Sequence, residues 1–223
     1  MSENGWGGKK SLKSAIDYYD KAADKKVPAT IYSLATFHEN GLGGLKMDKS
    51  KAMDYYRQDA ELGHAVCMYD LSVMLDTSDV RPQLKAEVMP WLLRSASAGL
   101  VAAEYKIGTR YQQGRGVQQD FVAAGAWFIR AARSGHGQAQ LHLGEIYEKG
   151  MGVKRDHGAA RQLFELSAKG GNLGGVVKYA EVLAKGIGGK QDIVEAYVCA
   201  ESAASAAAAY ANASNTPVGK LAI

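Results

Sequence analysis

Residues 139–156 read AQLHLGEIYEKGMGVKRD, and this stretch decides the fold. From Ala139 to Tyr147 the apolar residues fall at i, i+4, i+7 and i+8, which is the spacing of one face of a helix. Gly150 follows this pattern, at a place where glycine readily ends a helix because positive φ costs it little. Asp156 then stands where its carboxylate can accept the first free N–H groups of another helix. The stretch therefore predicts a helix, a tight turn and the start of a second helix.

The same pattern recurs every 36 residues, so that residues of one kind share a position, or column, in successive repeats. The Gly-x-Gly turns of three repeats begin at Gly114, Gly150 and Gly186. Further columns in this frame are Tyr55, Trp91, Trp127, Leu163 and Cys199; Ala60, Ala96, Ala132, Ala168 and Ala204; and Gly63, Gly99, Gly135 and Gly171. A lone hairpin of this size buries too little surface to fold, whereas stacked hairpins share a continuous core. We therefore predict an all-α, right-handed α-α superhelix (solenoid) of about five helix-turn-helix repeats.

The repeat boundaries follow from this frame. A half-repeat N-terminal cap is expected at 1–28, because Ser11–Asp24 matches a second helix alone. An Ala-rich extension of the last helix and a tail are expected at 209–223. The full repeats between them are expected at 29–64, 65–100, 101–136, 137–172 and 173–208.

Glycine accounts for 26 of the 223 residues, about 12% against roughly 7% in an average protein. Eight of these glycines form the four Gly-x-Gly turns, and four others stand at the ends of repeats. Because both sets end helices at fixed places, they support the helical prediction. Gly108 and Gly144 lie inside first helices instead, where Gly costs about 1 kcal/mol relative to Ala. We expect a neighbouring helix to pack closely against each of them.

The bulk composition excludes several classes of protein. With 47% hydrophobic and 22% charged residues, the chain is not globally disordered. A net charge of +4 without a dense Lys/Arg run argues against nucleic-acid binding. The sequence has no run of about 18 apolar residues, so we expect no membrane span. The N-terminus lacks the apolar core of a secretory signal, so we expect a cytoplasmic protein, or a periplasmic one if a signal has been removed.

The 65–100 repeat departs from the pattern. A Ser-Asp-Val triplet at 78–80 replaces Gly-x-Gly, Leu84 replaces the capping Asp, and Pro90 falls inside what is the second helix of other repeats. An interior Pro costs about 3 kcal/mol, so we expect this helix to begin late or to be kinked. One interpretation is a drifted repeat with a rebuilt loop. The other is an irregular lip for a partner, with the candidate residues Asp76, Ser78, Asp79 and Arg81.

No motif in the sequence predicts catalysis or metal binding. The Gly-x-Gly triplets follow helices and lack the Gly-x-x-x-x-Gly-Lys-Ser/Thr pattern of a phosphate loop. No Gly-x-Ser-x-Gly nucleophile motif occurs, and no His-x-x-x-His or Cys-x-x-Cys spacing indicates a metal site. His64 and His136 share the column after the terminal Gly, which favours packing or helix capping. We expect no catalytic residue, no metal and no cofactor.

The repeats 101–136 and 137–172 share a Gly-x-Gly-Val turn, a capping Asp, small and aromatic residues on the second helix, and a terminal Gly. In these columns the chain resembles the Sel-1-like repeat (SLR) family of tetratricopeptide-like α-solenoids, over about residues 11–208. The resemblance implies an adaptor or scaffold of the bacterial type, and some bacterial members are immunity proteins that neutralise a secreted toxin. Cys67 and Cys199 lie nearly four repeats apart, too far for a disulfide, so the disulfide-rich branch of the family does not fit.

Function is expected on the first helices, which line the concave face of such solenoids. Their residues off the core stripe are the candidate partner-binding residues: Tyr32, Tyr69, Asp70, Tyr105, Lys106, Arg110, His142, Glu145, Lys178 and Glu181. We expect a monomeric, non-enzymatic scaffold that binds a protein partner, with an immunity or inhibitor role toward a bacterial toxin as a narrower hypothesis. A merely solvated helix face explains most of these residues singly, and the Tyr residues can instead bury against the next repeat. The alternative function is a hydrolase or small-molecule binder with a site assembled across repeats.

Overall fold

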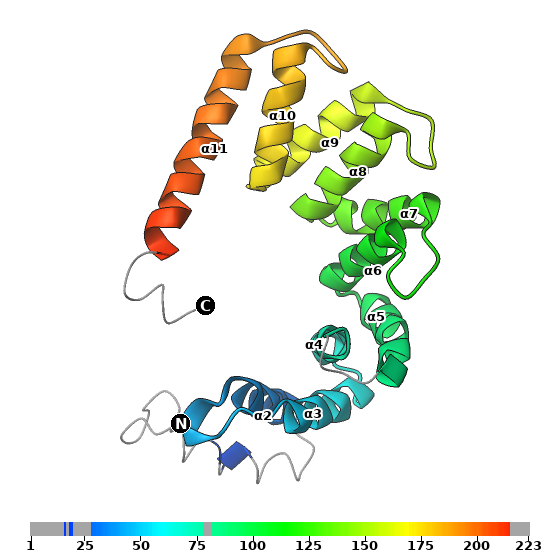
Figure 1. Ribbon diagram of the computed structural model, residues 1–223, viewed down its shortest axis with the longest axis vertical. Helices are drawn as coiled ribbons and strands as arrows, with labels where there is room; N and C mark the ends of the chain where they lie inside the picture. The colour runs from blue at the N-terminus through cyan, green and yellow to red at the C-terminus, as the bar shows by residue number, and fades with distance from the viewer. Residues whose placement is uncertain (1–15, 17, 20–27, 78–81, 215–223) are drawn as a thin grey trace. The chain divides into compact units, whose positions relative to one another are not determined.

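The computed structural model describes residues 16, 18, 19, 28–77 and 82–214. In this part of the chain all regular structure is helical (Figure 1). The chain divides into two compact units, unit 1 ending at Ala103 and unit 2 beginning at Glu104. Most of the predicted N-terminal cap, and the tail after residue 214, lie outside the described residues.

Unit 1 is a series of consecutive helices, each packed against the next. These are α2 (Pro28–Asn40), the short 3-10 helix η1 (Leu42–Gly44), α3 (Lys49–Glu61), α4 (Ala65–Leu75), the 3-10 helix η2 (Pro82–Glu87) and α5 (Val88–Ser97). α2 packs on α3, α3 on α4 and α4 on α5. Ile31, Leu34 and Phe37 of α2 form a buried cluster with Ile16, so the core of this unit continues toward the N-terminus.

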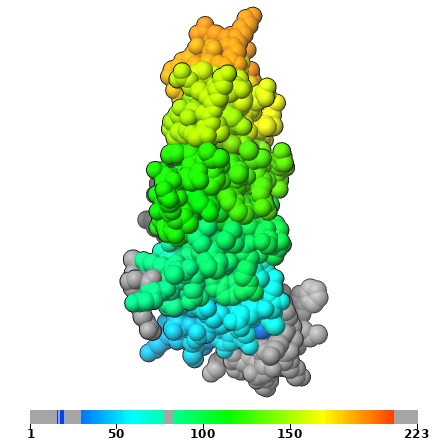
Figure 2. Space-filling model, turned by 90° about the vertical axis from the view of Figure 1, so that its right-hand side faces the viewer, coloured from blue at the N-terminus to red at the C-terminus, as the bar shows by residue number. Residues whose placement is uncertain are grey.

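Unit 2 continues the same alternation of first and second helices. Its helices are α6 (Val101–Gln113, whose first residues belong to unit 1), α7 (Phe121–Arg133), α8 (Gly137–Lys149), α9 (His157–Lys169), α10 (Leu173–Lys185) and α11 (Ile193–Ser214). Each helix from α7 to α11 packs on the next, and α8 also contacts α10. Figure 2 shows the segments from α6 to α10 as successive layers in chain order, from green to orange. α11 runs for 22 residues and includes the Ala-rich stretch that follows Ser202.

The capping residues predicted from the period do cap the second helices. The Asp48 side chain accepts a hydrogen bond from the Lys51 backbone N–H at 3.0 Å. Equivalent bonds, from Val122 and Ala123 to Asp120, from Ala159 to Asp156 and from Glu195 to Asp192, are 2.8–3.0 Å long. Each bond satisfies a backbone donor that the first turn of a helix otherwise leaves without a partner.

The two glycines inside first helices allow the close helix contact that their positions predict. A Cβ on Gly108 would stand 2.6 Å from Phe128 Cε1, and a Cβ on Gly144 would stand 2.5 Å from Phe164 Cε1. Both rings come from the second helix of the same repeat and have no exposed surface. A residue larger than Gly would leave no room for the ring at either position. Burial of the aromatic ring therefore offsets the loss of helix propensity at each Gly.

The divergent repeat keeps its second helix by starting it late, as its Pro predicts. α5 begins at Val88, three residues after the column at which α3, α7 and α9 begin, and η2 precedes it. Pro90 thus lies in the first turn of α5, where its missing N–H removes no intrahelical bond. Arg57 of α3 anchors this start through an ion pair of 2.7 Å with Glu87. Of the lip candidates, Asp76 ends α4 as its C-cap, whereas Ser78, Asp79 and Arg81 lie outside the described residues.

Among the helices of the described ranges, none is both long enough and apolar enough to cross a bilayer. The two cysteines, Cys67 and Cys199, are both free. This agrees with the expectation that the chain is not a disulfide-clamped repeat protein.

Candidate protein-binding face

The first helices of unit 2 carry a linked set of charges along one side, here called the charged ladder: His142, Glu145, Glu148, Lys178, Glu181 and Lys185. Lys178 Nζ lies 3.5 Å from Glu148 Oε2 of the preceding repeat and 3.1 Å from Glu181 Oε2. Lys185 Nζ lies 2.7 Å from Glu181 Oε1. His142 Nδ1 lies 3.4 Å from Glu145 Oε2. The ladder therefore spans α8 and α10 and joins two repeats.

The ion pairs of the ladder hold the charged groups in position but contribute little to the stability of the fold. Its side chains are partly exposed, and an exposed ion pair contributes only about 0–1 kcal/mol. Burial lowers the pKa of Lys178, but the carboxylates of Glu181 and Glu148 outweigh it and hold that pKa above its ordinary value. The adjacent His142 ring holds the pKa of Glu145 below its ordinary value. The charged forms of Lys178 and Glu145 are thus favoured, and the ladder presents both signs at fixed positions.

An aromatic and imidazole stack borders the ladder. Tyr105 of α6 stacks on His136 with ring centroids 4.6 Å apart and on His142 with centroids 5.8 Å apart. His142 also stacks on the buried Phe128 ring at 5.4 Å. Tyr105 therefore packs against the next repeat, as one of the two interpretations of the Tyr column predicts, while it stays half-buried at the surface.

His136 joins this stack to the cap of α8. Its Nδ1 accepts a hydrogen bond of 3.2 Å from the Ala139 backbone N–H, which confirms the predicted capping role. A ring nitrogen that accepts a hydrogen bond carries no proton, so the cap requires neutral imidazole. Burial lowers the pKa of His136. The folded state therefore takes up this proton at a lower pH than the unfolded chain does.

This difference predicts a pH-dependent loss of stability below the ordinary His pKa of about 6.5. As the pH falls below that value, the unfolded chain gains the proton first, and unfolding is favoured. We expect the free energy of unfolding to fall more between pH 7.5 and 5.5 in the parent chain than in His136→Asn. Asn172 already caps α10 at the same column, through a 2.8 Å bond from Gly175 N–H, so Asn is a matched replacement. Urea unfolding at both pH values measures the difference, and equal losses in the two proteins would refute the assignment.

In unit 1 the predicted residues Tyr32, Tyr69 and Asp70 are also half-buried on first helices. The Tyr32 ring lies 6.0 Å from the Tyr56 ring and 5.9 Å from the His64 ring, between centroids. Burial, followed by the nearby Glu39 carboxylate, raises the pKa of Asp70 to about 6, although His64 opposes the shift. The first helices of unit 1 therefore bring the carboxylates of Asp70 and Glu39 near each other, whereas the charged ladder of unit 2 carries charges of both signs.

The other candidates fall in different surroundings. Lys106 is half-buried on α6, one residue after Tyr105. Arg110 is only 4% exposed, and its Nη2 lies 2.7 Å from where a Cβ on Gly116 would stand. Arg110 thus packs under the turn after α6, and it does not present its guanidinium to a partner. Column spacing places Arg110 on a first helix, but it cannot show that the turn covers the guanidinium.

Two surface hollows in unit 2 lie over the turns between helices. One is lined by Tyr111 and residues 117–120, and the other by Arg161 and residues 190–193. The carboxylate in each hollow belongs to Asp120 or Asp192, which caps the helix that follows. The hollows therefore use structural groups, and neither includes a residue of the charged ladder.

The sequence patterns did not predict a group of side chains in unit 1 that meet across two helices: Asp59, His64 and Cys67. Asp59 Oδ2 lies 2.7 Å from His64 Nδ1 and 2.7 Å from Cys67 Sγ. Burial, followed by the hydrogen bond to Asp59, raises the pKa of the Cys67 thiol. A nucleophilic cysteine requires a lowered pKa and access to substrate, so this group does not fit a hydrolase. The signal that could have found it is Asp59 itself, a carboxylate in a column otherwise filled by Ser95, Ala131, Ser167 and Ala203.

The Sel1 repeat family matches residues 1–27, 28–64, 101–136, 137–172 and 175–207. The chain belongs to the Sel1 repeat family. The segment between residues 64 and 101, which contains the divergent repeat, lies outside these matches. Sel1 repeat proteins are in general non-enzymatic scaffolds that mediate protein–protein interactions, and the helical-repeat solenoid is their fold.

Two solved Sel1 structures resemble this chain throughout most of its length. A protective antigen of uropathogenic Escherichia coli with an SLR fold is 29% identical, with a TM-score of 0.86 over 92% of this chain and 44% of its own. A Sel1 repeat protein from Oxalobacter formigenes is 30% identical, with a TM-score of 0.80 over 92% of this chain and 84% of its own. Both agree with the predicted α-solenoid of Sel1 repeats.

Two further relatives mark how far the likeness extends. An immunity protein from Pseudomonas aeruginosa shares the fold, with a TM-score of 0.53 and 21% identity over 86% of this chain and 74% of its own. A chitin synthase regulator from Saccharomyces cerevisiae is 30% identical over 48% of this chain, which spans only 16% of that protein. The Sel1 repeats of this chain thus correspond to a small part of that regulator.

Proposed function

We propose that this Sel1 repeat chain binds a protein partner through the charged ladder of unit 2 and the Tyr105 stack beside it. The observation that carries the proposal is the arrangement of the ladder itself. Partly exposed charges of both signs are held in place by one another across α8 and α10. Charges fixed in advance lose little freedom on binding, and they select a partner whose own charges complement them. The half-buried Tyr105 supplies an aromatic anchor, a residue type enriched at binding hot spots.

The partner that fits this surface is a protein segment with charges of both signs and an apolar side chain for Tyr105. The ladder offers acidic groups at Glu145 and Glu148 and a basic group at Lys178. A uniformly acidic or basic polymer would meet like charges at some of these positions, which costs affinity. This supports a protein partner over a nucleic acid.

Charge reversal on the ladder tests the proposal. The ladder variant is the double substitution Lys106→Glu, Lys178→Glu, which reverses Lys178 of the ladder together with Lys106, the residue that stands in the same column and beside Tyr105. We expect it to weaken binding about tenfold or more, which corresponds to about 1.4 kcal/mol. The first step is affinity capture from the organism that encodes the chain. Mass spectrometry then compares the amount of each captured protein between the parent chain and the double variant. Calorimetry on the purified pair then measures the change in affinity.

The matched control for charge reversal is Lys169→Glu. Lys169 lies on the second helix α9, its side chain is 72% exposed, and it pairs with Glu165, so the net charge changes in the same sense away from the ladder. We expect this variant to bind like the parent chain. A partner that binds the ladder variant and the parent equally would exclude the ladder as the binding surface.

An immunity or inhibitor role toward a bacterial toxin is the narrower form of this proposal. The support for this role is the resemblance to a family that includes immunity proteins. The immunity protein of P. aeruginosa adds only a shared fold. If the gene beside this one encodes a toxin, co-expression of the chain is expected to restore growth to toxin-producing cells, and the ladder variant is expected to fail. Failure of the parent chain to protect those cells would reject the immunity role and leave binding of another protein to be tested by capture.

A further inference from the structure

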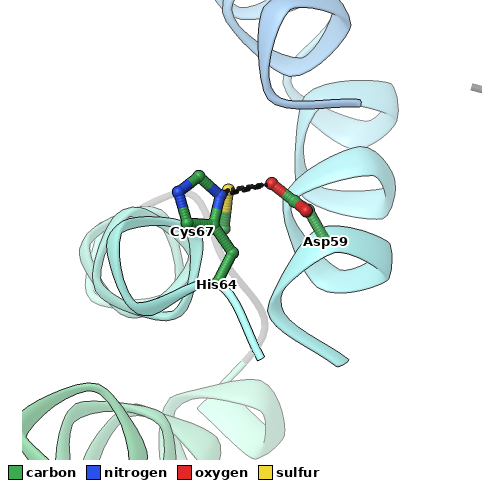
Figure 3. Close-up of side chains that lie close together, drawn as sticks. All are labelled: Asp59, His64 and Cys67. Atoms are coloured by element: carbon green, nitrogen blue, oxygen red, sulfur yellow. Dashed lines mark hydrogen bonds and ion pairs between the residues drawn. The ribbon is translucent and has the colours of Figure 1, made fainter. Parts of the chain in front are cut away.

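Three side chains with metal-binding atoms meet where α3 passes into α4. Asp59 comes from the last turn of α3, His64 directly precedes α4, and Cys67 lies in the first turn of α4. Asp59 Oδ2 is 2.7 Å from His64 Nδ1 and 2.7 Å from Cys67 Sγ, and the latter two atoms are 3.3 Å apart. Figure 3 shows the carboxylate pointing at the imidazole and the sulfur from across the two helices.

Asp59 is anomalous for its place in the repeat. The equivalent Ser95 and Ser167 donate hydrogen bonds of 2.7 Å to the backbone carbonyls of Ala65 and Gly137. Asp59 replaces this small hydroxyl with a carboxylate that has no exposed surface. Its second oxygen, Oδ1, is buried without a hydrogen-bond partner among the described residues. A buried carboxylate with an unsatisfied oxygen is costly, so the repeat alone does not explain it.

His64 is displaced from the role of its column. His136 and Asn172 use their side chains to cap the first helices that follow them. The His64 side chain makes no such bond to α4, and its Nδ1 is directed to Asp59 instead. Both departures from the repeat pattern therefore converge on the same point, beside the buried thiol of Cys67.

We propose that Asp59, His64 and Cys67 bind one Zn²⁺ ion. Thiolate sulfur, imidazole nitrogen and carboxylate oxygen are the donors that zinc prefers. Bond lengths of about 2.0–2.3 Å place tetrahedral zinc ligands roughly 3.4–3.6 Å apart. The three pairs of donor atoms lie 2.7, 2.7 and 3.3 Å apart, so each pair needs to open by less than about 1 Å.

Zinc binding also balances the charges and protons of the group. The ion replaces the thiol proton of Cys67, which is released to solvent, and His64 binds through Nδ1 with its proton on Nε2. The charge of +2 then neutralises the Cys67 thiolate and the Asp59 carboxylate. Water fills the fourth position, which it reaches from the side of His64, whose side chain is 39% exposed. The ion would link α3 to α4 at the start of the divergent repeat, in which the Gly-x-Gly turn of the other repeats is absent.

The test is metal binding by the full chain after chelation and reduction. We expect one zinc per chain by mass spectrometry of the metal, retained against a weak competing chelator. Co²⁺ added in place of zinc is expected to give a thiolate-to-cobalt charge-transfer band and the intense visible bands of tetrahedral cobalt. We also expect zinc to raise the melting temperature of the parent chain. Zinc absent after reconstitution, or a cobalt spectrum without the thiolate band, would overturn the proposal.

Each proposed ligand has a replacement that the chain itself uses in the same column. These variants are Asp59→Ser, His64→Asn and Cys67→Ala, which copy Ser95, Asn172 and Ala103. Because these residues suit the same backbone, we expect all three variants to fold, which circular dichroism checks. Each is expected to lose zinc, the thermal shift and the cobalt spectrum. The controls Cys199→Ala and His136→Asn are expected to keep all three, and zinc retained by Cys67→Ala would contradict the assignment.

Discussion

Replacing Phe164 by Ala is expected to lower the free energy of unfolding by about 3–5 kcal/mol. The ring has no exposed surface, and it lies in a buried cluster that α8, α9, α10 and α11 share. One side of the ring rests against Gly144, where the absence of a side chain leaves room for it. Several helices would therefore have to move together to close the cavity. Urea unfolding followed by far-ultraviolet circular dichroism measures the loss.

The matched control for this truncation lies on the same helix. Leu166 of α9 is 52% exposed, and we expect Leu166→Ala to change the free energy of unfolding by no more than about 0.5 kcal/mol. Equal effects of the two substitutions would show that Phe164 does not hold the repeats together.

Gly144→Ala is expected to destabilise the chain although it improves helix propensity. The new Cβ would stand 2.5 Å from Phe164 Cε1, and overpacking of a tight core costs about 1–3 kcal/mol. Ala recovers about 1 kcal/mol of helix propensity, so we expect a net loss of up to about 2 kcal/mol. Gly125→Ala is the control, because a Cβ on that glycine of α7 meets no atom within 4 Å. It is expected to stabilise the chain by up to about 1 kcal/mol.

A double variant separates the steric contact from other effects of Gly144. The divergent repeat has Ser72 and Leu92 in the columns of Gly144 and Phe164, so a smaller apolar residue tolerates a Cβ opposite it. We expect Gly144→Ala to cost less in a Phe164→Leu background than in the parent chain, by about 0.5–3 kcal/mol of coupling. Purely additive effects, or a stabilising Gly144→Ala in the parent, would contradict the contact.

The sequence period predicts most of the fold because the relevant forces act within one repeat. Asp156 must follow Gly150 at a fixed distance for the turn to close and the helix to be capped, so spacing alone reveals both. Gly144 is informative for the same reason, since an interior Gly in a helix implies a close neighbour. Pro90 likewise predicts the late start of α5, because its missing N–H is tolerated only in a first turn.

The candidate site is only partly predictable, since it depends on how side chains turn. Column spacing places Lys178 and Glu148 on successive first helices, and they do form an ion pair. It places Arg110 there too, but the turn at Gly116 covers that guanidinium. The sequence does not predict the group of Asp59, His64 and Cys67, because Asp59 and His64 lie on opposite sides of a helix connection, where no periodic spacing relates them.

Amide hydrogen exchange on the complex with the captured partner is the most direct test of protein binding by the charged ladder. With the partner bound, we predict that exchange slows in the peptides of α8 and α10 that carry the ladder. The same peptides of Lys178→Glu are expected to show little slowing at equal partner concentration. Slowing confined to the second helices α7 and α9 or to α11, with α8 and α10 unchanged, would contradict binding by the ladder.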